Sequence, residues 1–366
     1  MKVAVVGAGI VGATAAYYLS KEKDCQLTVF DYGQGQATKA AAGIISPWFS
    51  KRRNKAWYKM ARLGADFYIN LIADLQTDGW DTSFYKQTGV CLLKRDETKL
   101  TELKALASNR REESPLIGQL AILSQKEVSA RFPNLQGFDQ LLYASGGARV
   151  EGASLTETLL AASGCQVIQD KVSLKTLADG TYQLAGQTFD QVLLATGAWL
   201  PEILEPLGYE VDIRPQKGQL RDYFFTDFRT DNLPVVMPEG ELDIIPFKAG
   251  QVSVGASHEN DQGYDLIPDA QILQELESQA RVYLPILSRA KRHQERVGTR
   301  AYTSDFAPLY GQVPELTGVF AASGLGSSGL TTGPLIAKEL VNLLVGKSGQ
   351  LDKEDYPIER YICKKS

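Results

Sequence analysis

The segment at residues 7–12, Gly-Ala-Gly-Ile-Val-Gly, constrains the fold of this chain more than any other stretch. It follows an apolar run at residues 2–6 and opens an alanine-rich, helix-like segment that extends to residue 19. A second apolar run, residues 27–30, then ends at Asp31. A strand, a Gly-x-Gly-x-x-Gly turn, a helix and a second strand that ends in an acid form a unit that binds a dinucleotide.

Each glycine of the turn has its own task in such a unit. Gly7 permits the tight turn, and Gly9 lets the backbone approach a pyrophosphate. Gly12 lets the helix pack closely on the strand, so that the helix N-terminus faces the phosphates. Asp31 lies 19 residues after Gly12, close to the roughly 20 expected of an acid that accepts hydrogen bonds from an adenosine ribose. An ordinary strand-to-helix turn is the alternative, but strand, helix and acid in register favour dinucleotide binding.

Composition bounds the class of protein. The chain has 366 residues, a hydrophobic fraction of 44% and a net charge of -4, which is typical of a soluble globular protein with two domains, or one domain with a large insertion. Neither a nucleic-acid nor an anionic-membrane partner is expected. No apolar stretch approaches the roughly 18 residues that span a bilayer. Because the first strand begins at residue 2, we expect no removable signal sequence and a cytoplasmic location.

Cysteine and histidine are scarce and scattered. The four cysteines form no Cys-x-x-Cys pair, and the only histidines are His258 and His293. This distribution predicts reduced thiols and no metal site. It also argues against a Ser-His-Asp triad or any mechanism that needs several imidazoles.

The strand and helix pattern is interrupted twice after the first unit. Residues 89–93 indicate a strand and 97–109 a charged helix, followed by a capping box at Ser124 and Glu127. Regular alternation resumes near residue 150 and leads to the buried strand at 191–194 and to Gly197. Strands at 218–223 and 250–256 and a helix at 269–284 then form a second irregular block. The two blocks indicate a domain inserted into the nucleotide-binding fold.

The last part of the chain returns to that fold. A strand at residues 318–323 leads into a glycine-serine turn at 324–329 and a helix at 332–344. A second glycine-rich helix N-terminus offers a second place for polar atoms of the same ligand. The residues beyond Gly346 are expected to form a polar tail.

The order of these motifs resembles the FAD-dependent amine and amino-acid oxidoreductases of the D-amino-acid oxidase family, most closely the glycine oxidase and sarcosine oxidase branch. The resemblance covers essentially the whole chain. It rests on residues 7–12, Asp31, 41–44, 195–199, 217–219, 245–246, 254–256, 298–300, Asp305, Pro308, Gly311 and 324–334.

The resemblance implies a mixed α/β (α+β) fold in which a Rossmann-like FAD-binding domain carries an inserted substrate domain with a mixed sheet. The FAD-binding domain would comprise residues 1–84, 148–214 and 296–366, and the substrate domain residues 85–147 and 215–295. The helix near residue 332 would direct its positive end at the flavin ring. Carried over by position, the FAD contacts fall on Gly7, Gly9, Ile10, Val11, Gly12, Asp31, Tyr32, Ala37, Thr38, Ala42, Gly43, Ile44, Val172, Gly197, Leu325, Gly326, Ser327, Ser328, Gly329, Leu330 and Thr331.

The family chemistry implies oxidation of the C-N bond of glycine, sarcosine or a D-amino acid to an imine, by hydride transfer to flavin N5. The protein orients and desolvates the substrate, so no catalytic acid or base is required. Arg300 aligns with the arginine that binds the substrate carboxylate, a task that suits the fixed fork of a guanidinium. The structural alternative is that Arg300 pairs with an acid such as Asp305.

Departures from the family leave several points open. No cysteine lies near Arg300, where sarcosine oxidases tether the flavin, so FAD is expected to be non-covalent. Ser253 stands where those enzymes carry an oxygen-activating lysine, which leaves open whether oxygen or another electron acceptor reoxidises the flavin. Asp243 stands where glycine oxidases carry a tyrosine, and Ser327 stands where they carry a second substrate-binding arginine. Arg300, Ser327 and Asp243 are therefore the candidate substrate-binding residues, and the identity of the amino-acid or amine substrate stays open.

Three other functions compete with an oxidase. One is a dehydrogenase of the same fold that uses a quinone or another protein as acceptor. Another is a flavin-dependent binding or sensory subunit that has lost turnover, an alternative that the absent second arginine keeps open. A plain NAD dehydrogenase fits least, because no second nucleotide-binding half follows Asp31 and the turn at 324–329 would have no role. The sequence does not indicate the oligomeric state, and a homo-oligomer is one of the alternatives that stay open.

Overall fold

The first strand, β1 (Lys2–Val6), lies within a mainly parallel sheet of order β20-β21-β13-β1-β2-β9. The computed structural model describes residues 1–52 and 54–365. β1 pairs in parallel with β2 and β13, whereas β20 runs antiparallel to β21. The other strands of this sheet are β2 (Gln26–Phe30), β9 (Gln166–Ile168), β13 (Gln191–Leu194), β20 (Leu309–Gln312) and β21 (Val319–Ser323).

Helices pack around this sheet and against one another. α1 (Ile10–Leu19) is buried along its whole length and contacts both α6 (Gly152–Ser163) and α9 (Gly329–Leu344). α3 (Lys55–Thr77) packs against α9, and its apolar residues Met60, Phe67, Leu71 and Leu75 are buried. An apolar stripe at helical spacing drives this packing. The predicted strand, glycine turn, helix and strand at the N-terminus are confirmed as β1, α1 and β2.

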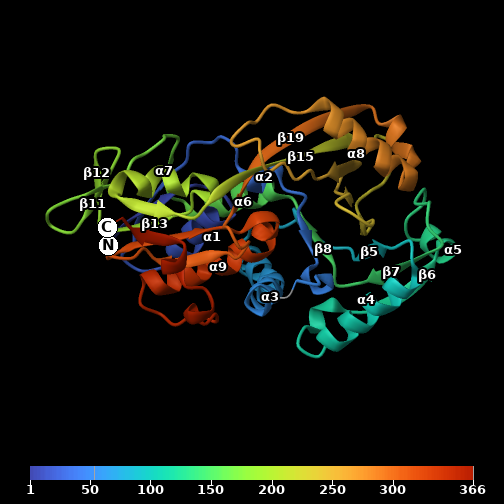
Figure 1. Ribbon diagram of the computed structural model, residues 1–366, viewed down its shortest axis with the longest axis horizontal. Coiled ribbons are helices and arrows are strands. Elements are labelled where there is room, and N and C mark those ends of the chain that lie inside the picture. The colour runs from blue at the N-terminus through green and yellow to red at the C-terminus, as the bar shows by residue number, and fades with distance from the viewer. Residues whose placement is uncertain (53, 366) are drawn as a thin grey trace.

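A second, mixed sheet has the order β19-β15-β18-β17-β16-β5-β7-β6. α8 (Ala270–Tyr283) lies beside β15 and β19, and α4 (Glu97–Arg110) and α5 (Gln125–Ser129) lie at the far end with β6 and β7 (Figure 1). The capping box predicted at Ser124 and Glu127 opens α5. The strands are β5 (Val90–Leu93), β6 (Leu120–Ser124), β7 (Gln140–Ala144), β15 (Arg214–Phe224), β16 (Val235–Met237), β17 (Asp243–Pro246), β18 (Gln251–Gly255) and β19 (Arg292–Tyr302).

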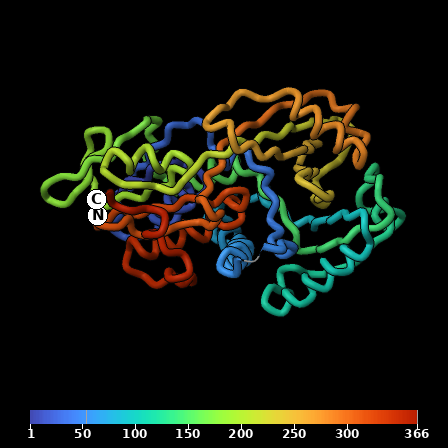
Figure 2. The backbone as a smooth tube through the Cα atoms, viewed as in Figure 1, coloured from blue at the N-terminus to red at the C-terminus, as the bar shows by residue number. Residues whose placement is uncertain are grey.

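The chain passes repeatedly between the two sheets. Figure 2 shows segments from the start, the middle and the end of the chain side by side in the half that contains both termini. The other half contains segments coloured cyan and yellow to orange, which contribute the second sheet. Segments far apart in sequence therefore lie side by side in each half of the molecule (Figure 2).

Shorter elements complete the fold. A small sheet has the order β3-β8-β4, and β10, β11 and β12 form an antiparallel meander. Their bounds are β3 (Ile44–Ile45), β4 (Tyr85–Gln87), β8 (Ala148–Val150), β10 (Lys175–Thr176), β11 (Tyr182–Leu184) and β12 (Gln187–Phe189), with α2 (Ala37–Ala40) and α7 (Leu200–Leu204). Over residues 1–52 and 54–365, no helix combines the length and apolar character needed to cross a bilayer.

Two elements begin earlier in the chain than the sequence predicted. α9 begins at Gly329, three residues before the predicted start, because the small residues of the turn already adopt helical geometry. β15 begins at Arg214, four residues before the predicted strand, and pairs along its length with β19. The early start of α9 matters for the site, because it brings the helix N-terminus into the glycine-serine turn.

The prediction of a polar tail beyond Gly346 is wrong. Its strand β22 (Ile362–Lys364) pairs antiparallel with β14 (Tyr209–Val211), and Tyr356 and Tyr361 are buried. The apolar residues of this segment are too sparse to show a period, yet each packs on residues far away in sequence.

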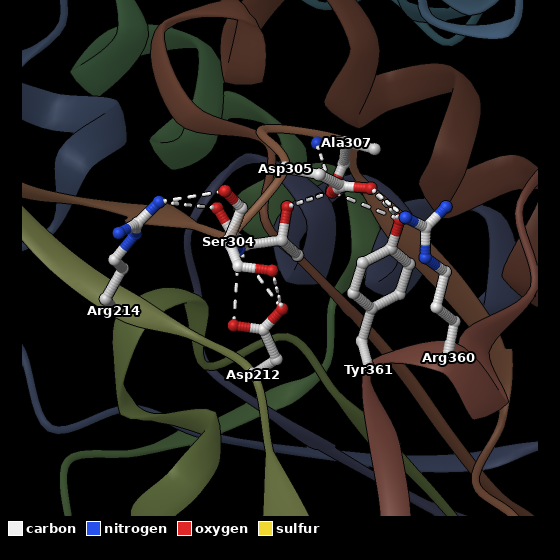
Figure 3. Close-up of polar contacts among 8 residues, drawn as sticks. Asp212, Arg214, Ser304, Asp305, Ala307, Arg360 and Tyr361 are labelled. Carbon is white, nitrogen blue, oxygen red and sulfur yellow. Dashed lines mark hydrogen bonds and ion pairs between the residues drawn. The ribbon is translucent and has the colours of Figure 1, made fainter.

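Polar contacts hold the same segment in place, as Figure 3 shows. The Tyr361 hydroxyl donates to the Asp305 carboxylate over 3.1 and 3.2 Å, and Arg360 forms an ion pair with it at 2.9 Å. The backbone N–H of Ala307 also donates to Asp305 over 3.2 Å. Asp305 is thus the acid that joins the C-terminal segment to the loop after β19.

Candidate cofactor and substrate site

A cavity of about 660 Å³ lies where the parallel strands β1, β2, β13 and β21 end. Its lining includes residues from the turns that follow these four strands, and from β19 and the loop before β17 in the second sheet. Ligands of open α/β sheets bind outside the carboxyl ends of the strands, where neighbouring strands connect in opposite directions. The size is also that of a cleft that encloses a small organic ligand.

The cavity collects almost all the residues that the sequence suggested for cofactor contact. Gly12 is the exception and does not line it. A Cβ atom there would lie 1.7 Å from the carbonyl oxygen of Gly7, so Gly12 serves the close contact between α1 and the turn. The predicted residues that line the cavity are Gly7, Gly9, Ile10, Val11, Asp31, Tyr32, Ala37, Thr38, Ala42, Gly43, Ile44, Val172, Gly197, Leu325, Gly326, Ser327, Ser328, Gly329, Leu330 and Thr331, with Arg300 and Asp243.

The backbone of the first glycine-rich turn, at Gly7 and Gly9, carries no side chain where it borders the cavity. Gly7 has a φ of +98°, which favours glycine, and its missing side chain leaves room for the Ala195 carbonyl. A Cβ atom on Gly9 would meet only the Thr38 hydroxyl oxygen, at 3.3 Å. The same hydroxyl accepts a hydrogen bond from the N–H of Ile10 over 2.9 Å. A ligand phosphate can therefore approach the backbone at Gly9.

The Asp31 carboxylate is held at the edge of the cavity by two donors. Oδ1 accepts the N–H of Ala8 over 3.0 Å, and Oδ2 accepts the side-chain amide of Gln36. Since a carboxylate oxygen can accept more than one hydrogen bond, both oxygens keep capacity for the hydroxyls of a ribose.

Several buried polar atoms of the lining have no partner among the described residues. They are Gln36 Oε1, Ser46 Oγ, Thr196 Oγ1 and Thr299 Oγ1. Buried polar groups in proteins nearly always have a hydrogen-bond partner, so these atoms fit a polar ligand that supplies one. Together with the bare glycine backbone, this set of donors and acceptors suits a dinucleotide.

The second glycine-rich turn is positioned by an aromatic residue. The N–H of Ser327 donates to the Tyr302 hydroxyl over 2.9 Å. Gly326 lies against the Tyr302 ring, where a Cβ atom would come within 2.0 Å of it. The turn leads directly into α9, whose 16 residues direct a partial positive charge at the cavity. Negative charge on a ligand is stabilised there.

Arg300 enters the cavity from β19. Its Nη1 donates to the side-chain oxygen of Gln216 over 3.0 Å and to the Ser257 carbonyl over 2.8 Å. The alternative that Arg300 pairs with Asp305 is wrong, because Asp305 pairs with Arg360. Burial lowers the pKa of Arg300 from its usual value, although nearby groups, among them Glu241, act in the opposite direction. Nε and Nη2 have no acceptor among the described residues, so they are available to a ligand anion.

Sequence reasoning missed Lys94, Glu241 and His258, which also line the cavity. His258 Nδ1 lies 3.2 Å from Glu241 Oε2, and burial, followed by the charge of Arg300, lowers the pKa of His258. The low histidine count directed attention away from His258. Its place two residues after the 254–256 motif was the available signal.

Ser253 does not line the cavity. It is fully buried, its hydroxyl donates to the Asp222 carboxylate, and it accepts a hydrogen bond from Arg296 over 3.1 Å. Across residues 1–52 and 54–365, no group of three His, Cys, Asp or Glu side chains is arranged to hold a metal ion.

Comparison with known proteins agrees with this geometry. A family model described as FAD dependent oxidoreductase (DAO) matches residues 2–343. The chain is 41% identical to YurR, an uncharacterised oxidoreductase of Bacillus subtilis, over 96% of this chain and 97% of that protein. It is 31% identical to a glycine oxidase of Pseudomonas putida, with 98% of each chain covered.

A solved structure is similar over the same length. The crystal structure of iminodiacetate oxidase from Chelativorans superposes with a TM-score of 0.90 at 32% identity and covers 98% of each chain. Matches of this extent leave no large part of the fold unaccounted for. The protein therefore belongs to the DAO family of FAD-dependent oxidoreductases, and FAD is its cofactor.

Proposed function

We propose that this protein oxidises the C-N bond of a small α-amino acid to an imine, and that Arg300 binds the substrate carboxylate. The observation that carries the proposal is the position of Arg300, a guanidinium with free donors in the cavity that also contains both glycine-rich turns. A guanidinium fork binds both oxygens of a carboxylate and so fixes the α-carbon. The named relatives, a glycine oxidase and an iminodiacetate oxidase, act on amines that carry a carboxylate.

Bound FAD supplies the acceptor for the α-hydrogen and its two electrons. The residues of this chain bind, orient and enclose the reactants: the turn at Gly9 and the Asp31 carboxylate hold the dinucleotide, and the N-terminus of α9 stabilises negative charge. Glycine, sarcosine and D-amino acids are the substrates that we propose. FAD is held without a covalent bond, because no cysteine is among the described residues that line the cavity.

The same proposal includes the two domains. Residues 1–84, 148–214 and 296–366 form the FAD-binding domain and contribute the strands of the parallel sheet. Residues 85–147 and 215–295 form the substrate domain. The four cysteines are free thiols, which fits a reducing compartment such as the cytoplasm.

An anaerobic screen tests the function. Purified protein is mixed with glycine, sarcosine, iminodiacetate and D- and L-amino acids without oxygen, and the absorbance of oxidised flavin is followed. We expect at least one of these compounds to bleach the flavin at a rate that saturates with concentration. Loss of bleaching in Arg300→Ala, with unchanged FAD content, would tie the reaction to the proposed anchor. If no amine bleaches the flavin, the proposal is wrong and the flavin-binding subunit without turnover is favoured.

The electron acceptor needs a separate measurement. Oxygen consumption during turnover would identify an oxidase. Anaerobic bleaching without oxygen consumption in air, together with reduction of an added quinone, would identify the dehydrogenase.

A further inference from the structure

Asp243 is a carboxylate in the cavity that no group of the described protein neutralises. It is the first residue of β17 and lines the cavity beside Glu241, Ala256 and His258. No hydrogen bond or ion pair to its side chain exists within residues 1–52 and 54–365. Burial raises the pKa of Asp243 to about 7. Asp243 is half-buried, and it lines the cavity.

The register of the second sheet puts Asp243 and Arg300 on one face. Asp243 is opposite Gly255 on β18, and Gly255 is opposite Leu220 on β15. Gly218 and Gln216 follow at steps of two along β15, and Gln216 is opposite Arg300 on β19. Directly paired residues share a face of a sheet, and every second residue along a strand returns to it. The face therefore carries an anion and a cation that line the same cavity.

A buried carboxylate without a partner is costly, and proteins pair such groups. A ligand cation would supply the partner that Asp243 lacks among the described residues. An α-amino acid in water carries a carboxylate and an ammonium on neighbouring atoms, which matches a face with Arg300 and Asp243.

We propose that Asp243 binds the ammonium of the amino-acid substrate and accepts one of its protons before the Cα–H bond breaks. This inference rests on the proposed function and adds a catalytic role for a residue that the family chemistry does not require. The reason is electronic: a protonated nitrogen has no lone pair with which to form the C=N bond when the hydride leaves.

The steps balance in protons and electrons. An N–H bond of the ammonium breaks, an O–H bond forms on the Asp243 carboxylate, and the electron pair stays on nitrogen. Bound FAD would supply the acceptor for the α-hydrogen and its two electrons, and the nitrogen lone pair that Asp243 has freed would form the C=N bond of a protonated imine. Asp243 returns its proton to water after the product leaves. A base whose pKa lies near neutral pH suits this task.

Other ionisable groups face the same cavity and must be distinguished from Asp243. Lys94 follows β5, Glu241 precedes β17, His258 follows β18 and Arg300 comes from β19. The neighbouring strand β16 contributes no ionisable side chain among Val235–Met237. At the cofactor side the lining includes Asp31, Asp170, Lys171 and Glu202. Of the groups near Asp243, His258 is the one that can also titrate between pH 5 and 8.

The first experiment is a pH profile of anaerobic flavin reduction from pH 5.5 to 10 with FAD-loaded protein. For the wild type, we expect the rate constant divided by the substrate dissociation constant to rise up to about pH 7 and then level off. In Asp243→Asn this ratio should be about 100-fold or more lower at pH 8. It should also continue to rise with pH until the pH reaches the pKa of the free substrate amine. Asp261 is exposed, and its side chain makes no hydrogen bond or ion pair among the described residues, so Asp261→Asn should keep the wild-type profile.

The second experiment requires no turnover. Propionate has the carboxylate but no amine, and its binding is followed by the change in flavin absorbance or by calorimetry. In the wild type we expect its affinity to fall about tenfold between pH 6 and 8.5, because ionised Asp243 repels it. In Asp243→Asn the affinity should be higher at pH 8.5 and independent of pH over this range. FAD content is measured for every sample.

The outcomes separate the two proposals. Failure of every amine to reduce wild-type flavin contradicts the proposed function, whereas the propionate titration still reports on Asp243. A wild-type propionate affinity that does not change with pH overturns the inference, and so does a fall that persists in Asp243→Asn, which would assign the titration to His258. An Asp243→Asn variant that keeps the wild-type pH profile of flavin reduction also overturns it.

Discussion

The guanidinium of Arg300 lies directly against Gly218 of the neighbouring strand. A Cβ atom on Gly218 would come within 2.7 Å of Arg300 Cζ, Nη1 and Nη2. Gly218 does not need a positive φ, so the backbone tolerates alanine and only the guanidinium has to move. The absence of a side chain at position 218 therefore sets where the proposed carboxylate anchor rests.

Gly218→Ala should displace Arg300 without unfolding the protein. We expect about tenfold weaker binding of propionate and of the substrate, because a charge-assisted hydrogen bond that loses its alignment costs about 1.5 to 3 kcal/mol. FAD content should not change. A double-mutant cycle supplies the control: in an Arg300→Ala background, Gly218→Ala should have no further effect on binding. A full additional loss there would show that Gly218 acts independently of Arg300.

Arg300→Lys should already be costly, and Arg300→Ala should be worse. A lysine keeps the charge but not the fork that binds two oxygens. We therefore expect the rate of flavin reduction by substrate to fall about tenfold or more in both variants. Arg292→Ala removes an exposed arginine from the same strand and should leave reduction kinetics unchanged. Wild-type kinetics in Arg300→Ala would rule out the anchor.

Gly9→Val should empty the cofactor site and leave the fold largely intact. A branched side chain would occupy the space where we place the pyrophosphate, although the only protein atom near its Cβ is the Thr38 hydroxyl oxygen. The flavin-to-protein absorbance ratio after purification measures the loss. Gly12→Ala is the contrast: it strikes the Gly7 carbonyl and should lower the melting temperature itself. A Gly9→Val protein with one FAD per chain would show that the phosphates lie elsewhere.

Asp305→Asn should destabilise the protein at neutral pH but not in acid. Burial acts to raise the pKa of Asp305, but hydrogen bonds from Ala307, Thr303 and Tyr361 and the charge of Arg360 outweigh it and lower the pKa. A lowered carboxyl pKa stabilises the fold above its value in the unfolded chain, about 3.9, and this contribution is lost as the pH falls through the folded pKa. We expect a loss of about 1 kcal/mol in the free energy of unfolding at pH 7, measured by urea titration, which shrinks below pH 4.

Asp243→Asn should have the opposite effect on stability. The raised pKa, about 7, means that the folded protein binds the proton more tightly than the unfolded chain does. Stability therefore falls as the pH rises from about 4 to 7, and asparagine removes this loss. At about 1.4 kcal/mol per pKa unit, the gain at pH 8 has an upper limit of about 4 kcal/mol, and water in the cavity reduces it.

Thermal unfolding of FAD-loaded protein at pH 5 and pH 8 checks this prediction. The difference in melting temperature between Asp243→Asn and the wild type should be larger at pH 8. An equal difference at both pH values would contradict an ionised, unpaired Asp243.

The cofactor half of the site could be predicted because its signals are local. Gly7, Gly9 and Asp31 belong to one strand-turn-helix-strand unit, and each residue type is required by the conformation or contact at its own position. The same holds for the capping box at Ser124 and Glu127, whose two hydrogen bonds join residues three apart.

The substrate half depended on contacts between distant segments. The register of β17 and β18 against β15 decides that Asp243 lies on the face that carries Arg300, and a shift of one residue would move its side chain to the other face. Ser253 shares its strand with the cavity-lining region, yet Asp222 and Arg296 cover it. No single stretch of the sequence shows which of these side chains lines the cavity.

The amino-acid sequence by itself determined the nucleotide-binding unit, because glycine geometry, apolar period and residue type act over a few neighbouring positions. The order of motifs along the whole chain indicated the family, and that resemblance made Arg300 the candidate anchor. Only the tertiary structure decided that Asp305 pairs with Arg360 and not with Arg300, and that Asp243 has no partner among the described residues on the face that carries Arg300. Those pairings bring together strands and a C-terminal segment that are distant in sequence, and their energy depends on burial and charge that exist only once the sheets have formed.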